Sequence, residues 1–325
     1  MSELLLLSRA DVAGLMDFPA YVAAVEAGFR AAAAGKALAP PAAGFSLPEG
    51  SYHAKGAALL GDAVAIKLNA NYPGNPASNG LPTVQGVIYL ADARNGRPLA
   101  LMDSIEITIN RTGAATTLAA RHLARPESRV ATICGAGVQG RIQARAIAAA
   151  LKLERIQLWD IRPDVARSLA GELSNELGLD VCAPPDLAVT RDSDVIVTAT
   201  PARKAYLTLD RVRAGTFIAA VGADNHDKSE IAPTLYAASL SVVDSLEQAA
   251  EIGDLRHALE AGAVTRDSVH ASLAELVSGA KRGRTDARVI TLFDSTGMGL
   301  QDVAAAVAVY RRALAAGAGT RFAIT

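Results

Sequence analysis

The stretch Arg129-Val-Ala-Thr-Ile-Cys-Gly-Ala-Gly-Val-Gln-Gly-Arg141 decides the fold of this chain. A short apolar run leads into Gly135, Gly137 and Gly140, and an alanine-rich helical stretch follows to about Leu151. A strand, a G-x-G-x-x-G turn and a helix in this order are typical of a segment that binds a dinucleotide. Gly135 allows the tight turn, Gly137 lets the backbone approach a pyrophosphate, and Gly140 lets the helix lie close to its strand.

The next apolar run, residues 156–159, ends in Asp160, at about the ~20-residue separation at which this motif places a ribose-binding acid. A carboxylate there accepts a hydrogen bond from the ribose 2′-hydroxyl and repels a 2′-phosphate, so NAD is predicted as the cofactor. Arg162 lies close enough to bind that phosphate, which leaves NADP as the alternative. An ordinary βαβ unit with a solvated aspartate explains the same pattern without a nucleotide.

Composition narrows the class of protein. The chain has 325 residues, half of them hydrophobic, which predicts two domains with a large core. A net charge of −1 and the lack of a basic stripe argue against a nucleic-acid partner. No apolar run reaches the ~18 residues of a membrane span, and residues 4–7 do not resemble a signal peptide. Cys134 and Cys182 are expected to be buried thiols, and the protein to be soluble and cytoplasmic.

The N-terminal part alternates between helix and short strands. Residues 9–36 have helical periodicity, with Ser8 as a cap, and the Pro40-Pro41 pair ends that pattern. Short strands separated by turn signals follow between residues 45 and 101 and predict a mostly antiparallel β unit, separate from the doubly wound sheet. Residues 108–124 then predict a helix that leads into the glycine turn.

Beyond Asp160, strands and helices alternate. A helix is predicted for residues 163–177 and a last helix for residues 302–316. The predicted strands between them are residues 181–182, 195–199, 216–221, 240–243 and 289–293. This order predicts an α/β fold, a doubly wound Rossmann-type parallel sheet with helices on both faces, accompanied by a smaller α+β domain.

Small and polar residues follow the predicted strands, at the edge where such sheets bind ligands. Thr200 follows one strand and Ser295 another, and both are candidate contacts of a cofactor ring or ribose. Asp224 lies in a glycine-containing loop after a third strand. The strand-end rule predicts that Asp224 belongs to a functional site, although a turn-forming aspartate is its alternative.

The β unit supplies candidate cations. Lys67 lies in an apolar strand, either pointing to water from an edge or buried beside an anion, because an unpaired buried cation is costly. Arg111 either forms a structural salt bridge or grips a carboxylate with two hydrogen bonds. His53 and Lys55 share one face of a strand and either line the same pocket or face solvent.

Several classes of site are not supported. The five histidines are scattered, so no zinc-type cluster and no metal site is predicted. The chain also lacks a G-x-S-x-G elbow and a G-x-x-x-x-G-K-[ST] loop, so hydrolase and kinase activities are not predicted.

Taken together, several motifs resemble the ornithine cyclodeaminase/mu-crystallin family of NAD(P)-dependent imine and amino-acid oxidoreductases. The resemblance extends over nearly the whole chain, and its C-terminal half is most similar to the archaeal alanine dehydrogenase branch. It rests on the motifs Lys67-Leu-Asn-Ala-Asn-Tyr-Pro-Gly-Asn-Pro76, Gly80-Leu-Pro-Thr-Val84, Met102-Asp103, Arg111-Thr-Gly-Ala-Ala115, the glycine turn, Val221-Gly-Ala-Asp224, Lys228-Ser-Glu230 and Phe293-Asp-Ser-Thr-Gly297.

The resemblance implies a homodimer. Residues 1–112 and 301–325 would form the substrate-binding and dimerisation domain, and residues 113–300 the NAD(P)-binding domain. Lys67 and Arg111 would hold the substrate carboxylate, and Thr296 would border the substrate. Asp224, and Lys67 with it, would act in catalysis at the reacting nitrogen. The implied cofactor contacts are Thr83, Arg111, Thr112, Gly135, Gly137, Val138, Gln139, Gly140, Asp160, Arg162, Thr200, Lys228 and Ser295.

The chain departs from the family pattern at one point. Family members often carry a basic residue shortly after the Pro-Pro position, where this chain has Ala42-Ala43. His53 and Lys55 are the candidates to replace that cation. The substrate is therefore expected to be a small α-amino or α-imino acid. The sequence does not identify its side chain.

The expected reaction is reversible hydride transfer at C2 of that acid. Two cations from the β unit and one acid from the α/β part are expected to meet beside the nicotinamide. One alternative is an ornithine or lysine cyclodeaminase that recycles its NAD. The other is a dinucleotide-binding protein with little catalysis, as mu-crystallin is.

Overall fold

The computed structural model describes residues 3–324, and the chain divides into two compact units. One unit comprises the described parts of Met1–Ala114 and Met298–Thr325, and the other comprises Ala115–Gly297. Each unit is built on its own eight-stranded sheet. We call them the β-rich unit and the glycine-turn unit.

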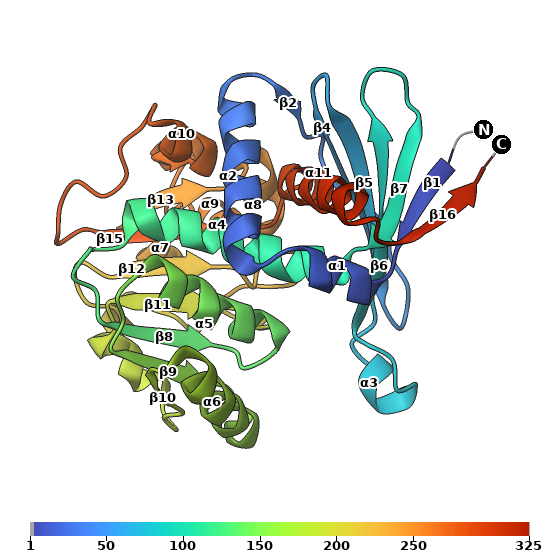
Figure 1. The fold of residues 1–325 in the computed structure, drawn as a ribbon. Helices are drawn as coiled ribbons and strands as arrows, with labels where there is room; N and C mark the ends of the chain where they lie inside the picture. Colours follow the sequence, from blue (N-terminus) through green and yellow to red (C-terminus); the bar gives the residue numbers. More distant parts are fainter. Residues whose placement is uncertain (1–2, 325) are drawn as a thin grey trace. The chain divides into compact units, whose positions relative to one another are not determined.

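The glycine-turn unit contains a fully parallel sheet with the strand order β10-β9-β8-β11-β12-β15-β13-β14 (Figure 1). Its strands are β8 (Val130–Cys134), β9 (Arg155–Trp159), β10 (Asp180–Cys182), β11 (Val195–Thr198), β12 (Phe217–Ala220), β13 (Ser239–Val243), β14 (Ala271–Ser272) and β15 (Ile290–Asp294). From β8 the chain proceeds outward to β9 and β10, then returns to β11 and continues in the opposite direction. The reversal between β8 and β11 is the point at which sheets of this kind bind a nucleotide.

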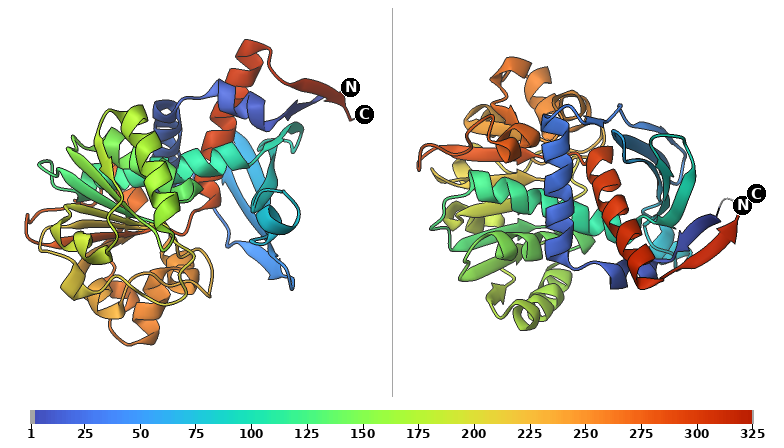
Figure 2. Two further views of the ribbon diagram at one scale, coloured as in Figure 1. Left: turned by 90° about the horizontal axis from the view of Figure 1, so that it is seen from below. Right: turned by 45° about the horizontal axis from the view of Figure 1, so that its top comes forward.

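Helices cover both faces of this sheet (Figure 2). The helices α5 (Val138–Ala150) and α6 (Pro163–Leu177) lie on one face, and α7 (Pro233–Ala237), α8 (Leu246–Ile252) and α9 (Asp254–Glu260) lie on the other. Strand residues such as Ile133, Ile196 and Leu292 are completely buried. The doubly wound fold predicted from the alternation of strands and helices is confirmed.

The β-rich unit contains a mostly antiparallel sheet in the order β16-β1-β7-β6-β5-β4-β2, with β3 paired to β4. Its strands are β1 (Glu3–Leu7), β2 (Ala37–Leu38), β3 (Ala43–Ser46), β4 (Ser51–Leu59), β5 (Ala63–Asn71), β6 (Val84–Asp92), β7 (Pro98–Asp103) and β16 (Thr320–Ala323). Only β1 and β7 run parallel. The last strand, β16, pairs with the first, so both ends of the chain belong to this sheet (Figure 1).

One face of this sheet is covered by α11 (Gly299–Ala316), which packs on β4 and β5 and lies beside α2 (Phe18–Ala33), as Figure 2 shows. Close packing depends on small residues. A Cβ on Gly299 would lie 2.4 Å from the carbonyl oxygen of Gly56, and a Cβ on Gly28 would lie 2.8 Å from the Cβ of Ala304. The first contact holds α11 against β4, and the second holds it against α2.

The predicted helix over residues 9–36 is in fact two helices, α1 (Arg9–Leu15) and α2. Asp17 starts the second helix, because its side chain accepts a hydrogen bond of 3.0 Å from the Ala20 N–H. Among residues 3–324 no single helix is long and apolar enough to cross a membrane. The pair α1 and α2 passes that test only together, and the two are bent by 88°.

Three further expectations need correction. The helix predicted for residues 108–124 is α4 (Ile105–Leu123), so Arg111 lies within the helix and not near its start. The last helix begins at Gly299 and not at residue 302, which places Asp302 in its first turn. Cys134 is buried as predicted, but Cys182 is only partly buried because β10 is an edge strand.

Candidate functional site

Two cations in the β-rich unit share one carboxylate. Lys67 Nζ lies 2.7 Å from Asp302 Oδ2, and Arg111 Nε donates to Asp302 Oδ1 over 3.0 Å. The three side chains are between 1% and 6% exposed. The buried-cation alternative for Lys67 is therefore correct, and the anion beside it is Asp302 of the chain itself. We call Lys67, Arg111 and Asp302 the cation cluster.

Three elements position the cation cluster. Lys67 lies on β5, on the same buried face as Ala65 and Asn69, while Ile66 and Leu68 point to the other face. Arg111 comes from α4 and Asp302 from the first turn of α11. The alternation of a strand thus brings a lysine inward, and the helix that covers the sheet supplies the acid.

The cation cluster contains two basic groups and one acidic group, and burial shifts the pKa values of Lys67 and Asp302. Burial lowers the pKa of Lys67 to about 7, and Asp302 opposes this effect. Burial also acts to raise the pKa of Asp302, but Lys67 and Arg111 outweigh it, so that pKa lies below its usual value. Two cations around one carboxylate leave a net positive charge whenever Lys67 is protonated, which favours the binding of a further anion.

Both cations retain hydrogen-bonding capacity. A guanidinium has five N–H donors, and Arg111 uses Nε for Asp302 and Nη1 for Gln301 Oε1, which lies 2.6 Å away. Lys67 also donates to Thr108 Oγ1 over 3.5 Å. The remaining donors suit a planar carboxylate ligand.

His53 and Lys55 lie on β4 directly opposite Asn69 and Lys67, respectively. Lys55 therefore adds positive potential to the cation cluster and contributes to lowering the pKa of both Lys67 and Asp302. His53 Nε2 lies 2.9 Å from Ser51 Oγ. The strand register thus places both residues beside the cluster, on the same face of the sheet as Lys67.

The glycine-turn unit contains the predicted dinucleotide motif at the carboxyl end of β8. Gly135 has φ +104°, a conformation that favours glycine, and its N–H donates to the Trp159 carbonyl over 2.7 Å. A Cβ on Gly140 would lie 1.8 Å from the Gly135 carbonyl oxygen, so only glycine fits there. A Cβ on Gly137 would meet no atom within 4 Å, and this residue caps α5 without a side-chain hydrogen bond. Backbone N–H groups at this helix end are thus available to a pyrophosphate.

Asp160 follows β9 and shapes this turn. Its Oδ2 accepts from the Ala136 N–H over 2.8 Å, and its Oδ1 accepts from the Arg162 N–H over 2.9 Å. The Arg162 side chain is 65% exposed, with Nε 3.6 Å from Asp160 Oδ1. The acid therefore sits at the glycine turn as predicted, and an exposed guanidinium stands beside it. The residues fit an adenosine ribose and allow a 2′-phosphate as well.

The other predicted cofactor residues occur in both units. In the glycine-turn unit, Val138 and Gln139 form the first turn of α5, with Val138 exposed. In the β-rich unit, Thr83 precedes β6, and its carbonyl accepts from the Tyr72 N–H over 2.7 Å. Thr112 lies on α4 and donates to the Thr108 carbonyl over 2.7 Å.

The loop after β12 carries Asp224, which is half exposed and forms an ion pair of 2.6 Å with Lys228 Nζ. A hydrogen bond of 2.8 Å joins His257 on α9 to the carbonyl of Lys228 and holds the far end of this loop. Asp224 is thus a carboxylate beside an ammonium at a strand end. The ammonium favours the ionised form of this carboxylate, which suits a group that stabilises a positive charge on a ligand.

The loop after β15 is held by Asp244, which directly follows β13. This buried carboxylate accepts from Thr296 Oγ1 over 2.9 Å, from Ser295 Oγ over 3.3 Å and from the Gly297 N–H over 2.6 Å. Thr296 Oγ1 also accepts from Gln248 Nε2 over 2.7 Å. Ser295 and Thr296 are therefore rigidly placed at the carboxyl edge of the sheet.

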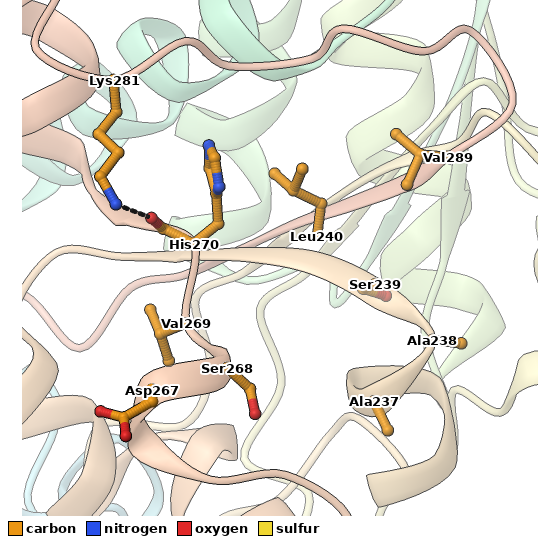
Figure 3. A pocket seen from close by; sticks show the side chains of 10 residues that line it. All are labelled: Ala237, Ala238, Ser239, Leu240, Asp267, Ser268, Val269, His270, Lys281 and Val289. Carbon is orange, nitrogen blue, oxygen red and sulfur yellow. Dashed lines mark hydrogen bonds between the residues drawn. The ribbon is translucent and has the colours of Figure 1, made fainter.

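A separate pocket lies at the opposite, amino-terminal edge of this sheet, near the starts of β13 and β15 (Figure 3). Its lining includes His270 and Lys281, whose Nζ donates to the His270 carbonyl over 3.0 Å. None of the predicted site residues lines it. Among residues 3–324 no group of three or more His, Cys, Asp or Glu is arranged to hold a metal ion.

Sequence reasoning missed four buried acids that support the predicted residues: Glu230, Asp244, Asp254 and Asp302. Asp302 could have been found, because a buried lysine requires an anion and Asp302 is the acidic residue of α11. The others carry no local signal, since their partners are backbone N–H and hydroxyl groups from distant loops.

The last two glycines of the motif predict different defects. Gly137→Ala should fold normally, because its Cβ has open space, but should bind NADH much more weakly because the methyl group blocks the approach of a pyrophosphate. Gly140→Ala should lower the melting temperature, because the Cβ collides with the Gly135 carbonyl. Calorimetry and NADH titration check this, with Gly171→Ala on α6, which also has open space, as the control. Unchanged NADH binding in Gly137→Ala would contradict the assignment.

The cation cluster predicts a pH dependence of stability. Between pH 7 and 10.5 the unfolded chain keeps the Lys67 proton and the folded chain has lost it. The free energy of unfolding therefore rises with pH in that window, by at most about 1.4 kcal/mol per pH unit. Urea unfolding of Lys67→Met should lack this rise, and Lys204→Met, which removes an exposed cation, is the control. An identical slope in wild type and Lys67→Met would contradict the prediction.

Comparison with known proteins places the chain among relatives of similar length. The model of the ornithine cyclodeaminase/mu-crystallin family matches residues 2–317. An alanine dehydrogenase of Archaeoglobus fulgidus is 36% identical over 319 residues, which is 98% of each chain.

Solved structures agree with this match. An archaeal alanine dehydrogenase dimer with bound NAD superposes with a TM-score of 0.95 at 36% identity, over 99% of this chain and 100% of that one. The Δ1-pyrroline-2-carboxylate reductase of Thermococcus litoralis, in complex with NADH and L-proline, superposes with a TM-score of 0.94 at 36% identity. The match covers 98% of this chain and 99% of that one.

Proposed function

The chain belongs to the ornithine cyclodeaminase/mu-crystallin family, and from this premise we propose that it is an NAD(P)-dependent oxidoreductase acting on the C–N bond of small α-imino or α-amino acids. The observation that carries the proposal is the cation cluster, in which Lys67 and Arg111 surround a single acid and retain donors for a second carboxylate. NADH, with NADPH as the alternative, would supply the hydride in imine reduction, and the oxidised cofactor would accept it in the reverse reaction.

The two units have different roles in this proposal. The β-rich unit binds the substrate, because it carries Lys67, Arg111 and the flanking His53 and Lys55. A substrate carboxylate beside Lys67 raises the pKa of that lysine and keeps it charged. The glycine-turn unit binds the dinucleotide through its glycine turn and Asp160.

The substrate is oriented through its carboxylate. Arg111 can grip both oxygens of that group, and Lys67 adds a point charge, so C2 is fixed for hydride transfer. Such positioning supplies several kcal/mol of a reaction barrier. The C2 atom of an imine accepts hydride more readily when the imine nitrogen is protonated, and Asp224 supplies or stabilises the proton on that nitrogen. Lys228, 2.6 Å from Asp224, holds the carboxylate in place between turnovers.

Asp224 can be tested directly. Asp224→Asn should lower kcat for imine reduction by roughly 10²–10⁴-fold, because an amide cannot supply the proton, while NADH binding stays within a few fold. Asp227→Asn, an exposed aspartate in the same loop, is the matched control and should keep wild-type kinetics. Full turnover by Asp224→Asn would remove Asp224 from the mechanism.

An assay of NADH oxidation with a set of candidate substrates also separates the proposed reductase from a cyclodeaminase and from a binding protein. It pairs NADH or NADPH with cyclic imines and with 2-oxo acids plus ammonia. Ammonia release from ornithine or lysine without net NADH change would identify a cyclodeaminase. A purified protein that binds NADH and converts none of these compounds would be a binding protein.

The outer face of the β-rich sheet suits a homodimer. On this face Ile66, Leu68 and Val87 are 48%, 45% and 39% exposed, and Leu68 lies directly opposite Val87. Exposed apolar patches on a sheet mark interaction surfaces. The archaeal alanine dehydrogenase is a dimer, which supports a second copy of this chain as the partner.

A charge on this face should separate the copies. Leu68→Asp places an unpaired carboxylate in the apolar contact and should give a monomer in light scattering after size-exclusion chromatography. Leu209→Asp, at a comparably exposed leucine of the glycine-turn unit, is the control and should stay dimeric. A dimeric Leu68→Asp would exclude this face, and a monomeric wild type would exclude the dimer.

A further inference from the structure

Glu230 is completely buried in the glycine-turn unit and ties together the loops that follow two neighbouring strands. Its Oε1 accepts from the N–H of Thr200 over 2.8 Å and from Thr200 Oγ1 over 2.6 Å. Its Oε2 accepts from the N–H of Gly222 over 2.9 Å. Thr200 follows β11, and Gly222 follows β12 two residues before Asp224.

The surroundings of Glu230 are built for a carboxylate. Tyr206 Oη also donates to Oε1 over 3.0 Å, so four donors from three residues meet one side chain. A Cβ on Gly222 would lie 2.3 Å from Oε2, so a glycine is required for this approach. Burial raises the pKa of Glu230, and the hydrogen bonds from Thr200 oppose the shift.

A second acid fixes Glu230 itself. Asp254, at the first position of α9, accepts from the backbone N–H groups of Glu230 and Ile231 over 2.8 and 3.0 Å. On the same helix, His257 holds the carbonyl of Lys228. Helix α9 thus anchors residues 228–231, and the Glu230 side chain carries that anchoring to Thr200 and Gly222.

We propose that Glu230 is a positioning residue that sets the nicotinamide end of the cofactor site by locking the Thr200 loop to the Gly222–Asp224 loop. The inference rests on the proposed function, in which Asp224 exchanges the proton, and on Thr200 as a cofactor contact, as the family resemblance implies. The glycine turn and Asp160 bind the adenosine and pyrophosphate part and make no contact with Glu230 among the described hydrogen bonds. We therefore expect Glu230 to affect the nicotinamide half of the dinucleotide more than the adenosine and pyrophosphate half.

The conservative change Glu230→Gln tests this division. An amide keeps the volume but replaces one acceptor oxygen by an NH2 group, which then faces the N–H of Thr200 or of Gly222. One of the two loops must move away. The Kd of NADH should rise about tenfold or more, because a charge-assisted hydrogen bond is lost, while the Kd of ADP-ribose, which lacks nicotinamide, stays within about twofold.

The control is Asp194→Asn at the amino-terminal edge of the same sheet. Asp194 is also buried and accepts from the N–H groups of Arg129 and Val130 over 2.8 and 3.0 Å. This variant should lower the melting temperature and leave the ratio of the two Kd values unchanged. It shows what general destabilisation of the unit does to binding.

The outcomes are distinct. Equal weakening of NADH and ADP-ribose in Glu230→Gln, or no change in either, would overturn the inference. If Glu230→Gln does not fold, Tyr206→Phe removes one donor to Oε1 and should change the same ratio in the same direction by a smaller factor, and an unchanged ratio would overturn the inference. A wild type that binds NADH but reduces no imino acid would refute the proposed function, while the binding ratio would still decide the role of Glu230.

Discussion

The shared carboxylate of Asp302 is the interaction on which the β-rich unit depends. Burying Lys67 or Arg111 without an anion would cost several kcal/mol, and one aspartate compensates both. When Lys67 is protonated, the cluster keeps one uncompensated positive charge, which attracts a further anion. The last helix of the chain, α11, therefore covers the sheet and sets the electrostatics of the predicted substrate site at the same time.

In the glycine-turn unit, four loops at the carboxyl edge of the parallel sheet are held in place by hydrogen bonds. The unit uses acids as acceptors for backbone N–H groups: the partly buried Asp160 for the glycine turn, the buried Glu230 for the loops after β11 and β12, and the buried Asp244 for the loop after β15. Burial penalises each carboxylate, and several donors at each site offset that penalty. Loops held in this way lose little further entropy when a ligand binds.

The sequence predicts features that depend on local pattern. The glycine spacing and the strand–helix alternation follow from periodicity and backbone sterics, and the structure agrees with both, whereas the pattern around Lys67 leaves a buried and a solvent-facing position open. The break between α1 and α2 has a local signal in Asp17 and Pro19, an N-cap residue and a proline in the first turn, which the helical periodicity of residues 9–36 masks. Asp302 and Glu230 were missed as partners because they lie 191 and 30 residues from Arg111 and Thr200, respectively, so only tertiary structure brings them together.

The central claim is that the cation cluster recognises a substrate carboxylate. The most direct test compares kcat/KM for NADH-dependent reduction of Δ1-pyrroline-2-carboxylate with that for Δ1-pyrroline, which has the same ring and imine but lacks the carboxylate. The account predicts a ratio of about 10² or more in favour of the carboxylated imine, since charge-assisted contacts to two cations are lost without it. Equal efficiency with both imines would contradict the account.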